Sequence, residues 1–518
     1  MTDTVSLRFP PLSETDPLFA KKKYLLNSRN MTTLNFELQI SCSLLPTLDR
    51  VVEVSRILNL NEIELYFVED GDSGPFSPRN EMEALNSIIS IIESEASFLA
   101  GNGKYQTWEE LRVLIVHLIQ SNLLNNEVDK LIEIKNFDSQ SEELLLNWGF
   151  HHGVKTKLKI SHFEGAGRGA VALENIYVGE TALEIPESFI ISEAVLIDSK
   201  MLKVFEKADG ISVDTMLLLW SMKERFDFNS KYKVYFETLP QEFKTGLSFG
   251  IEALGALDGT ILFGEIMEAK EHLRKQYEEL CPVLCSKHPE VFPPEFYTWD
   301  RFLWACELWY SNSMKVVFSD GSLRTCLIPV AGLLNHSISP HILHYGKVDL
   351  VTRTLKFNLS KPCKAGEQCY LNYGNHTSSH FLTFYGFLPC GDNPYDVIPL
   401  DFEDSGESCC HMVRGTWLSK TKKKDINMDF NHGLPSPLLA YFRDLLLNEE
   451  GRERFVFENM KSTFETLMEG LELNEFDEYF DRENCSWDLK LALECRDLQR
   501  RIISSVLSSC DEALMGLT

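Results

Sequence analysis

The chain has 518 residues, of which 44% are hydrophobic and 25% are charged. Both fractions are typical of globular proteins, and the length is sufficient for two or three domains. With 50 basic and 77 acidic side chains, the formal net charge is −27. This charge repels polyphosphates, which disfavours direct nucleic-acid binding, and it attracts basic protein segments.

The thirteen cysteines are scattered and lack the spacing of a disulfide framework, so we expect reduced thiols, as in the cytoplasm or nucleus. Asp3 and Glu14 disfavour import into the chloroplast stroma, because transit peptides avoid acidic residues. Cys281, Cys285 and His288 have no second pair of ligands, so we assign no metal. No apolar run reaches the roughly 18 residues of a membrane helix, and we predict no membrane partner.

Residues 1–138 are predicted to be a helical extension with a disordered leader, which ends near the three lysines at 21–23. Thr107 and Glu110 have the spacing of a capping box and precede apolar residues at helical spacing. A second capping box at Ser139 and Glu142 predicts that a new domain begins there.

The sequence pattern changes in residues 139–390, where short runs typical of β-strands are separated by turn residues. The candidate strands are KLKISHF, AVALENIYVGETALEIP, VDLVTRTLKFNLS and AGEQCYLNYG. Helical periodicity from about 200 to 310 interrupts them, and residues 391–518 are again helical. The sequence therefore predicts an α+β domain with a helical insert, between an N-terminal helical extension and a C-terminal helical domain.

The glycine-rich segment EGAGRGA, with Gly165, Gly167 and Gly169, allows a close backbone approach to a ligand. A phosphate-binding loop would have Lys and Ser or Thr after the last glycine, whereas Ala170 and Val171 follow. A dinucleotide-binding fold would have a helix there, whereas the next residues resemble strands. Two interpretations remain, a plain β-turn and a β-turn that covers a cofactor, and the motif alone favours the plain turn.

Two further motifs combine apolar and polar residues. LLNHS, at residues 333–337, ends an apolar run with adjacent polar side chains, and YLNYGNHTSSHFLTFYGF contains Tyr373, Tyr385 and Phe387. Each motif alone is explained by ordinary turn or core positions. The order of the three motifs along the chain is the stronger signal.

This order resembles SET-domain protein methyltransferases, and specifically the branch that includes the plant Rubisco large-subunit lysine methyltransferases. The similar motifs lie between about residue 139 and residue 389: LLLNWGFHHGV, GAGRG, YKVYFETLPQEF, LLNHS, GEQCYLNYG and FYGF. The resemblance implies short β-sheets in which the LLNHS segment passes beneath a neighbouring strand in a knot-like crossing. It also implies S-adenosylmethionine as the cofactor.

The resemblance further implies the residues of the site. Tyr373 and Tyr385 would be catalytic and would line a lysine channel together with Met314. The cofactor would be bound by Glu164, Gly165, Ala166, Gly167, Asn312, Asn335, His336, Tyr373 and Phe387. Such a site suits methyl transfer to an amine, because it aligns the reactants and because a desolvating channel lowers the lysine pKa from its usual value of about 10.4.

The sequence departs from the resembling enzymes at Asn312, where they usually have Arg, and at Gly332, where they usually have Asp. One alternative is therefore a weakened SET fold that serves as a binding module. Another is a protein-histidine methyltransferase, as in the branch that modifies actin, although Met314 and Tyr385 favour lysine. A histone tail is disfavoured because no cysteine cluster follows Phe387. We expect a monomer whose C-terminal domain positions a non-histone protein substrate.

Overall fold

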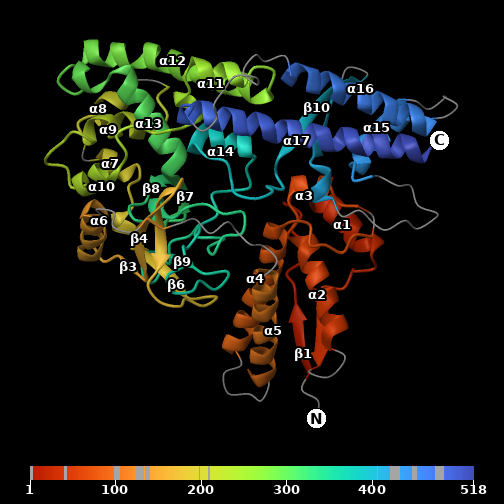
Figure 1. Ribbon diagram of the computed structural model, residues 1–518. Coiled ribbons are helices and arrows are strands. Elements are labelled where there is room, and N and C mark those ends of the chain that lie inside the picture. Colours follow the sequence, from red (N-terminus) through yellow and green to blue (C-terminus); the bar gives the residue numbers. More distant parts are fainter. Residues whose placement is uncertain are drawn as a thin grey trace.

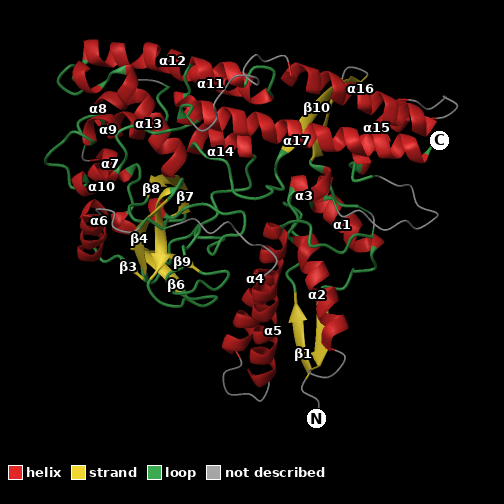
Figure 2. Ribbon diagram, in the orientation of Figure 1, coloured by secondary structure: helices red, strands yellow, loops and turns green. Residues whose placement is uncertain are grey.

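The computed structural model describes most of the chain (Figure 1). The described residues are 4–39, 44–69, 71–98, 105–123, 133–134, 140–197, 199–207, 210–404, 407–419, 432–445, 452–472 and 484–517. Ser139, the predicted start of the second domain, lies outside these ranges. Figure 2 shows that helices dominate and that the strands lie in separate small groups.

Short antiparallel strands form the centre of the middle part of the chain. Several lie where the sequence predicted strands, but the strands at 313–317 and 323–327 were not predicted. The strands and the helix before them are α6 (Gln140–His151), β3 (Lys155–Thr156), β4 (Leu158–Phe163), β5 (Gly167–Ala172), β6 (Thr181–Pro186), β7 (Ser313–Val317), β8 (Leu323–Leu327) and β9 (Thr354–Asn358). β3, β6 and β9 form one sheet, while β4–β5 and β7–β8 are hairpins. Because Glu184 pairs with Lys356, the sheet joins residues on both sides of the insert.

The insert between β6 and β7 is helical and packs above these strands (Figure 1, yellow to green). Its helices are η1 (Glu187–Phe189), α7 (Ala194–Ile197), α8 (Leu202–Phe205), α9 (Val213–Glu224), α10 (Lys233–Thr238), η2 (Gly246–Ser248), α11 (Ile251–Ala256), α12 (Ile261–Lys287), η3 (Pro294–Phe296) and α13 (Trp299–Asn312). One buried cluster contains both Phe302 of the insert and Phe357 of β9. The insert and the strands therefore share a single core.

The N-terminal part is not purely helical. Its elements are β1 (Thr4–Arg8), α1 (Phe19–Ser28), β2 (Asn35–Gln39), α2 (Leu44–Leu58), α3 (Glu62–Tyr66), α4 (Pro78–Phe98) and α5 (Tyr105–Leu123). The predicted disordered leader is wrong for residues 4–23, because β1 pairs with β2 and buries Val5, Leu7 and Phe9, and because α1 begins at Phe19. The alternation of apolar and polar residues in TVSLRF is the strand signal that the prediction missed.

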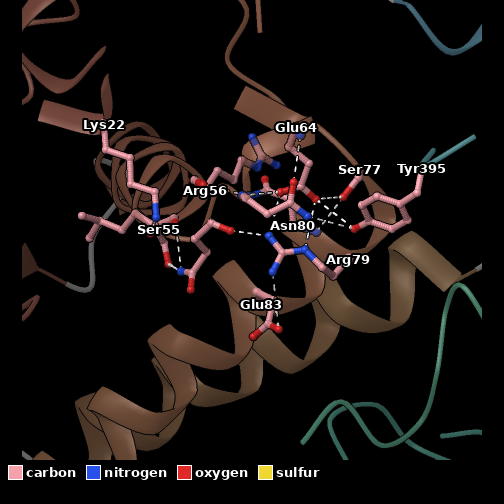
Figure 3. A network of polar contacts seen from close by, with 12 residues as sticks. Lys22, Ser55, Arg56, Glu64, Ser77, Arg79, Asn80, Glu83 and Tyr395 are labelled. Carbon is pink, nitrogen blue, oxygen red and sulfur yellow. Dashed lines mark hydrogen bonds and ion pairs between the residues drawn. The ribbon is translucent and has the colours of Figure 1, made fainter. Parts of the chain in front are cut away.

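A buried polar network holds the N-terminal part against the rest of the chain (Figure 3). Arg79 donates through Nε and Nη2 to the two carboxylate oxygens of Glu64, at 3.1 and 2.7 Å. Ser77 and Tyr395 also donate to Glu64 through their hydroxyls. Tyr395 lies just after the middle part of the chain, 331 positions from Glu64 in the sequence. The network therefore joins the N-terminal part to the end of the middle part.

The C-terminal part begins with a hairpin instead of a helix. Its elements are β10 (Val397–Asp404), β11 (Glu407–Arg414), η5 (Thr416–Leu418), α15 (Ser436–Leu445), α16 (Arg452–Glu472) and α17 (Trp487–Gly516). Figure 1 shows α17 lying along α16 and reaching the insert. Among the described residues, no helix is long and apolar enough to span a membrane.

Candidate active site

The segment that ends in Asn335 and His336 crosses the segment that leads to Tyr373. The Leu371 N–H donates to the Asn335 carbonyl at 2.8 Å, and the Asn372 N–H donates to the Ile342 carbonyl at 3.0 Å. Residues 370–373 are thus held on both sides by the loop 335–342, which is the crossing that the resemblance implied. AGEQCYLNYG, predicted as a strand, makes isolated bridges and not a continuous ladder.

Asn335 and His336 make their polar contacts within the protein. The Asn335 Nδ2 donates to the Arg168 carbonyl at 2.8 Å and to Gln368 Oε1 at 2.9 Å. The His336 Nδ1 accepts from the Tyr373 N–H at 3.2 Å. Its Nε2 is buried and has no hydrogen-bond partner among the described residues. Burial lowers the pKa of His336 to about 4, so the imidazole is neutral at physiological pH.

The glycine-rich turn 164–167 joins β4 to β5 and is largely exposed. Gly165 and Gly167 have φ values of +74° and +65°, and no atom lies within 4 Å of a Cβ at either position. Gly169 has a different role, because its Cβ would lie 2.5 Å from Gln368 Oε1. The first two glycines form an open turn that leaves room for a ligand, whereas the third allows protein side chains to pack closely.

The predicted aromatic residues lie together around helix α14 (Ser378–Tyr385). The rings of Tyr373 and Tyr385 stack with centroids 5.2 Å apart and planes at 27°. Phe381 stacks on Phe387 at 5.4 Å and contacts His336 at 4.5 Å. For an aliphatic chain to pass between two ring faces, the faces must be about 7 Å apart, because the chain makes one van der Waals contact of about 3.5 Å with each face. The faces of the two tyrosines are therefore too close to admit such a chain between them, and together they form one continuous aromatic wall.

The hydroxyl of Tyr373 donates to the Leu334 carbonyl at 2.6 Å, which fixes the ring against the crossing. Burial raises the pKa of Tyr373 and of Tyr385, so both remain phenols near neutral pH. A third tyrosine belongs to the same buried region: burial raises the pKa of Tyr345 to about 12, with a smaller contribution from Tyr385. Sequence reasoning missed Tyr345, because its segment ILHYGKV has no pattern that distinguishes it from an ordinary loop.

A cavity of about 120 Å³ lies beside the crossing, between the insert and the strands. Its lining includes Arg168, Tyr235, Thr238, Asn312 and Gly332. A Cβ at Gly332 would lie 3.5 Å from Asn312 Oδ1, so the two positions that depart from the resembling enzymes face each other. The guanidinium, the amide and the open turn 164–167 fit a polar cofactor.

Several known proteins are similar to this chain in sequence, at identities below 30%. The chloroplastic ribulose-1,5-bisphosphate carboxylase/oxygenase large subunit N-methyltransferase of Nicotiana tabacum is 24% identical over 356 residues, 66% of this chain and 70% of that enzyme. The actin-histidine N-methyltransferase of Gallus gallus is 23% identical over 394 residues, 73% of this chain and 64% of that enzyme. The chloroplastic fructose-bisphosphate aldolase-lysine N-methyltransferase of Arabidopsis thaliana is 28% identical, over 43% of this chain and 46% of its own length. No family model matches the chain.

The structure of Rubisco LSMT bound to AdoMet superposes with a TM-score of 0.54 at 20% sequence identity, over 73% of this chain and 93% of that one. The chain has a SET-domain fold. The predicted α+β class and the resemblance to the Rubisco LSMT branch are confirmed. The SET domain of LSMT bound to lysine and AdoHcy gives a TM-score of 0.55 at 19% identity. The ligands of these two structures agree with the predicted cofactor.

Within this SET domain, the predicted site residues divide into three groups. His336, Tyr373, Tyr385 and Phe387 lie in one aromatic cluster. The turn with Glu164, Gly165, Ala166 and Gly167 is held near them, because the following Arg168 carbonyl accepts from Asn335. Asn312 lines the cavity, and Met314 is buried on β7, in the core cluster on which Tyr373 also packs. Their roles in binding and catalysis remain predictions.

A second polar cluster in the SET domain escaped sequence reasoning. His341, Cys363 and Cys369 are buried, and their potential ligand atoms lie within 4.8 Å of one another. The His341 Nδ1 accepts from the Tyr370 N–H at 3.1 Å, so Nε2 carries the ring proton and faces Glu367 at 3.7 Å. A metal-binding histidine would instead donate from its second nitrogen. We therefore interpret the cluster as a hydrogen-bonded group and assign no metal to it.

Proposed function

We propose that the chain is an S-adenosylmethionine-dependent protein N-methyltransferase that modifies lysine in a non-histone protein. The observation that carries this proposal is the crossing, which places the Asn335–His336 segment against Tyr373 while Tyr373 stacks on Tyr385. Relatives named as N-methyltransferases, over up to 73% of the chain, support the reaction class.

The residues present fit the cofactor, which supplies a methyl group from its sulfonium centre when it is bound. The open turn 164–167, the cavity with Asn312 and the ring of Phe387 would hold it. Tyr373 orients the reacting groups, because its proton is donated to the Leu334 carbonyl and its oxygen lone pairs remain available as acceptors. Alignment of this kind accounts for several kcal/mol of the barrier in reactions between two bound groups.

Lysine must lose its proton before it can act as a nucleophile. Tyr373 and Tyr385 are not the base, since burial raises the pKa of both and keeps them protonated. The aromatic wall instead favours the neutral amine by desolvation, and the proton leaves to solvent. This mechanism requires neither a basic side chain nor a metal.

Histidine is the second candidate acceptor, because the actin-histidine enzyme of Gallus gallus is similar over 73% of the chain. Lysine is favoured by the apolar Met314 on β7 and by Tyr385, whose phenol closes one side of the predicted channel. A binding module without turnover is the third candidate, because Asn312 and Gly332 replace charged residues of the resembling enzymes.

One experiment separates these candidates. The full chain is incubated with S-adenosylmethionine carrying a tritiated methyl group and a protein extract, and the labelled protein is analysed by mass spectrometry after digestion. We expect label on a lysine ε-amine. Label on an imidazole would assign the chain to histidine. The binding module would be the correct candidate if no protein were labelled and calorimetry detected no binding of S-adenosylhomocysteine at millimolar concentration.

A further inference from the structure

The cavity beside the crossing has one charged residue in its lining, Arg168. It lies on β5, directly after the open turn, and its side chain is 21% exposed. The other lining groups are apolar residues and uncharged polar residues, including Tyr235 and Asn312. The lining therefore contains one positively charged group, and the carboxylate with which it forms an ion pair, that of Glu142, is not part of the lining.

The guanidinium of Arg168 is held in place from the protein side. Its Nη1 donates to the Thr238 carbonyl and lies 3.6 Å from Glu142 Oε1. These described contacts both use Nη1, whereas a guanidinium has five N–H donors in a planar fork. The fork is thus pre-positioned, and its remaining donors are available to a carboxylate, the partner for which bidentate binding is strongest.

Asn312 supplies a complementary acceptor. Its Nδ2 donates to Ser311 Oγ at 2.7 Å, and its Oδ1 faces Gly332. The cavity therefore combines a cation with a neutral acceptor, which matches a zwitterionic α-amino acid group. Val330, which also lines the cavity, has φ +73° and ψ −51°. Such a conformation is strained for a β-branched residue, and strain of this kind clusters at functional sites.

We propose that Arg168 binds the carboxylate of the methionine end of S-adenosylmethionine and that Asn312 Oδ1 accepts from its ammonium group. This inference rests on the proposed function. It explains why the Arg and the Asp of the resembling enzymes are both missing, at Asn312 and Gly332: the positive charge comes from β5 instead, and an added carboxylate at residue 332 would lie against the bound one.

The test is a thermodynamic cycle measured by calorimetric titration of the full chain. The two ligands are S-adenosylhomocysteine and its carboxyl methyl ester, which lacks the negative charge, and the two proteins are the wild type and Arg168→Gln. We expect either single change to weaken binding by roughly 10- to 150-fold, as for the loss of a charge-assisted hydrogen bond. We expect both changes together to cost little more than one, because they remove the same contact.

Arg274→Ala is the matched control, because Arg274 is exposed and pairs with Glu278 on the surface of α12. It should alter the affinity for neither ligand. Additive losses in the cycle, or an ester that binds the wild type as tightly as the acid, would overturn the role of Arg168 while leaving the proposed function intact. If Arg168→Gln does not fold, Arg168→Lys, which keeps the charge but loses the planar fork, takes its place in the cycle. A wild-type chain that binds neither ligand would overturn both proposals.

Discussion

At the scale of single residues, the hydroxyl of Tyr373 has a role that can be isolated. Tyr373→Phe removes the hydrogen bond to the Leu334 carbonyl and the oxygen that orients the reacting groups. We expect kcat to fall at least 10-fold, the affinity for S-adenosylhomocysteine to change little, and the free energy of unfolding to fall by about 1 kcal/mol. Steady-state kinetics, calorimetry and urea unfolding measure these quantities. Tyr177→Phe, at an exposed position, is the control, and wild-type turnover in Tyr373→Phe would refute the assigned role.

Asp396 provides a test of pH dependence. Burial raises its pKa from 3.8 to about 6, while its hydrogen bonds to the Ser378 N–H and hydroxyl oppose the shift. The folded protein keeps this proton to higher pH than the unfolded chain does, so the contribution of Asp396 to stability decreases as pH rises from about 4 to about 6. In Asp396→Asn, we expect the unfolding free energy relative to wild type to rise over this window by up to roughly 3 kcal/mol. Urea unfolding at several pH values measures the difference, and a flat difference profile would contradict the raised pKa.

Sequence reasoning found the site residues that belong to motifs and missed those that only the fold brings near. Tyr373, Tyr385 and Phe387 could be predicted because they occur in a fixed order with recognisable spacing. Tyr345 and the His341–Cys363–Cys369 cluster could not, because their proximity depends on how the loop 335–342 crosses residues 370–373. For Gly169, a close approach was predicted but its partners were not: they are the side chains of Gln368 and Asn335.

At the scale of elements, the C-terminal end of α14 packs closely against the backbone of the insert. Gly386 has φ +76°, and a Cβ there would lie 1.7 Å from the Lys244 carbonyl, in the part of the insert between α10 and η2. Gly386→Ala must therefore push the segment that carries Tyr385 and Phe387 away from the backbone of Lys244 and Thr245. We expect a loss of at least 3 kcal/mol of stability together with weaker cofactor binding, measured by urea unfolding and calorimetry.

Gly366→Ala is the matched control for this prediction. Gly366 has φ +82°, but a Cβ there would have no atom within 4 Å, so the variant carries only the cost of a left-handed conformation, about 1 to 2 kcal/mol. If both variants lost the same stability, the cost of Gly386→Ala would come from its positive φ and not from a clash with Lys244.

The N-terminal part braces an element of the site although no motif places it there. His344 Nε2 lies 2.8 Å from Glu83 Oε2 of α4, and Leu343 belongs to the buried core of the N-terminal part. The next residue is Tyr345, which interacts with the tyrosine pair. The spacing of apolar residues could predict the helices of the N-terminal part. It could not predict how they pack on the middle part, because single contacts such as Glu83–His344 determine that packing.

At the scale of the whole molecule, α17 connects the C-terminal part, the insert and the aromatic site. One buried cluster contains Leu493 of α17, Leu262 of α12 and Leu382 of α14. The C-terminal part was predicted to position the protein substrate. That role stays a prediction, whereas the structure shows that this part buries one face of the helix that carries Tyr385.

Leu493→Ala tests this support. Leu493 is 2% exposed, and we expect the variant to lose about 2 to 5 kcal/mol of unfolding free energy and to bind S-adenosylhomocysteine more weakly. Chemical unfolding and calorimetry give both values. Leu445→Ala, at a position 54% exposed, should change neither. An unstable Leu493→Ala with normal cofactor affinity would separate the C-terminal part from the site.

The pattern of short β-branched or alternating runs between turn residues predicted β4, β5, β6 and β9, although Ala170, Val171 and Ala172 of β5 are all buried and do not alternate. It did not predict that the insert shares their core, since Phe302 and Phe357 have ordinary apolar neighbours in sequence. The crossing has a consequence for biosynthesis. Asn335 lies 167 positions after Arg168, whose carbonyl it binds, so a ribosome needs on the order of 10 to 30 s to make the second partner after the first. During that interval the β4–β5 hairpin lacks the hydrogen bond that Asn335 makes to it, so the crossing can form only after most of the domain has been synthesised.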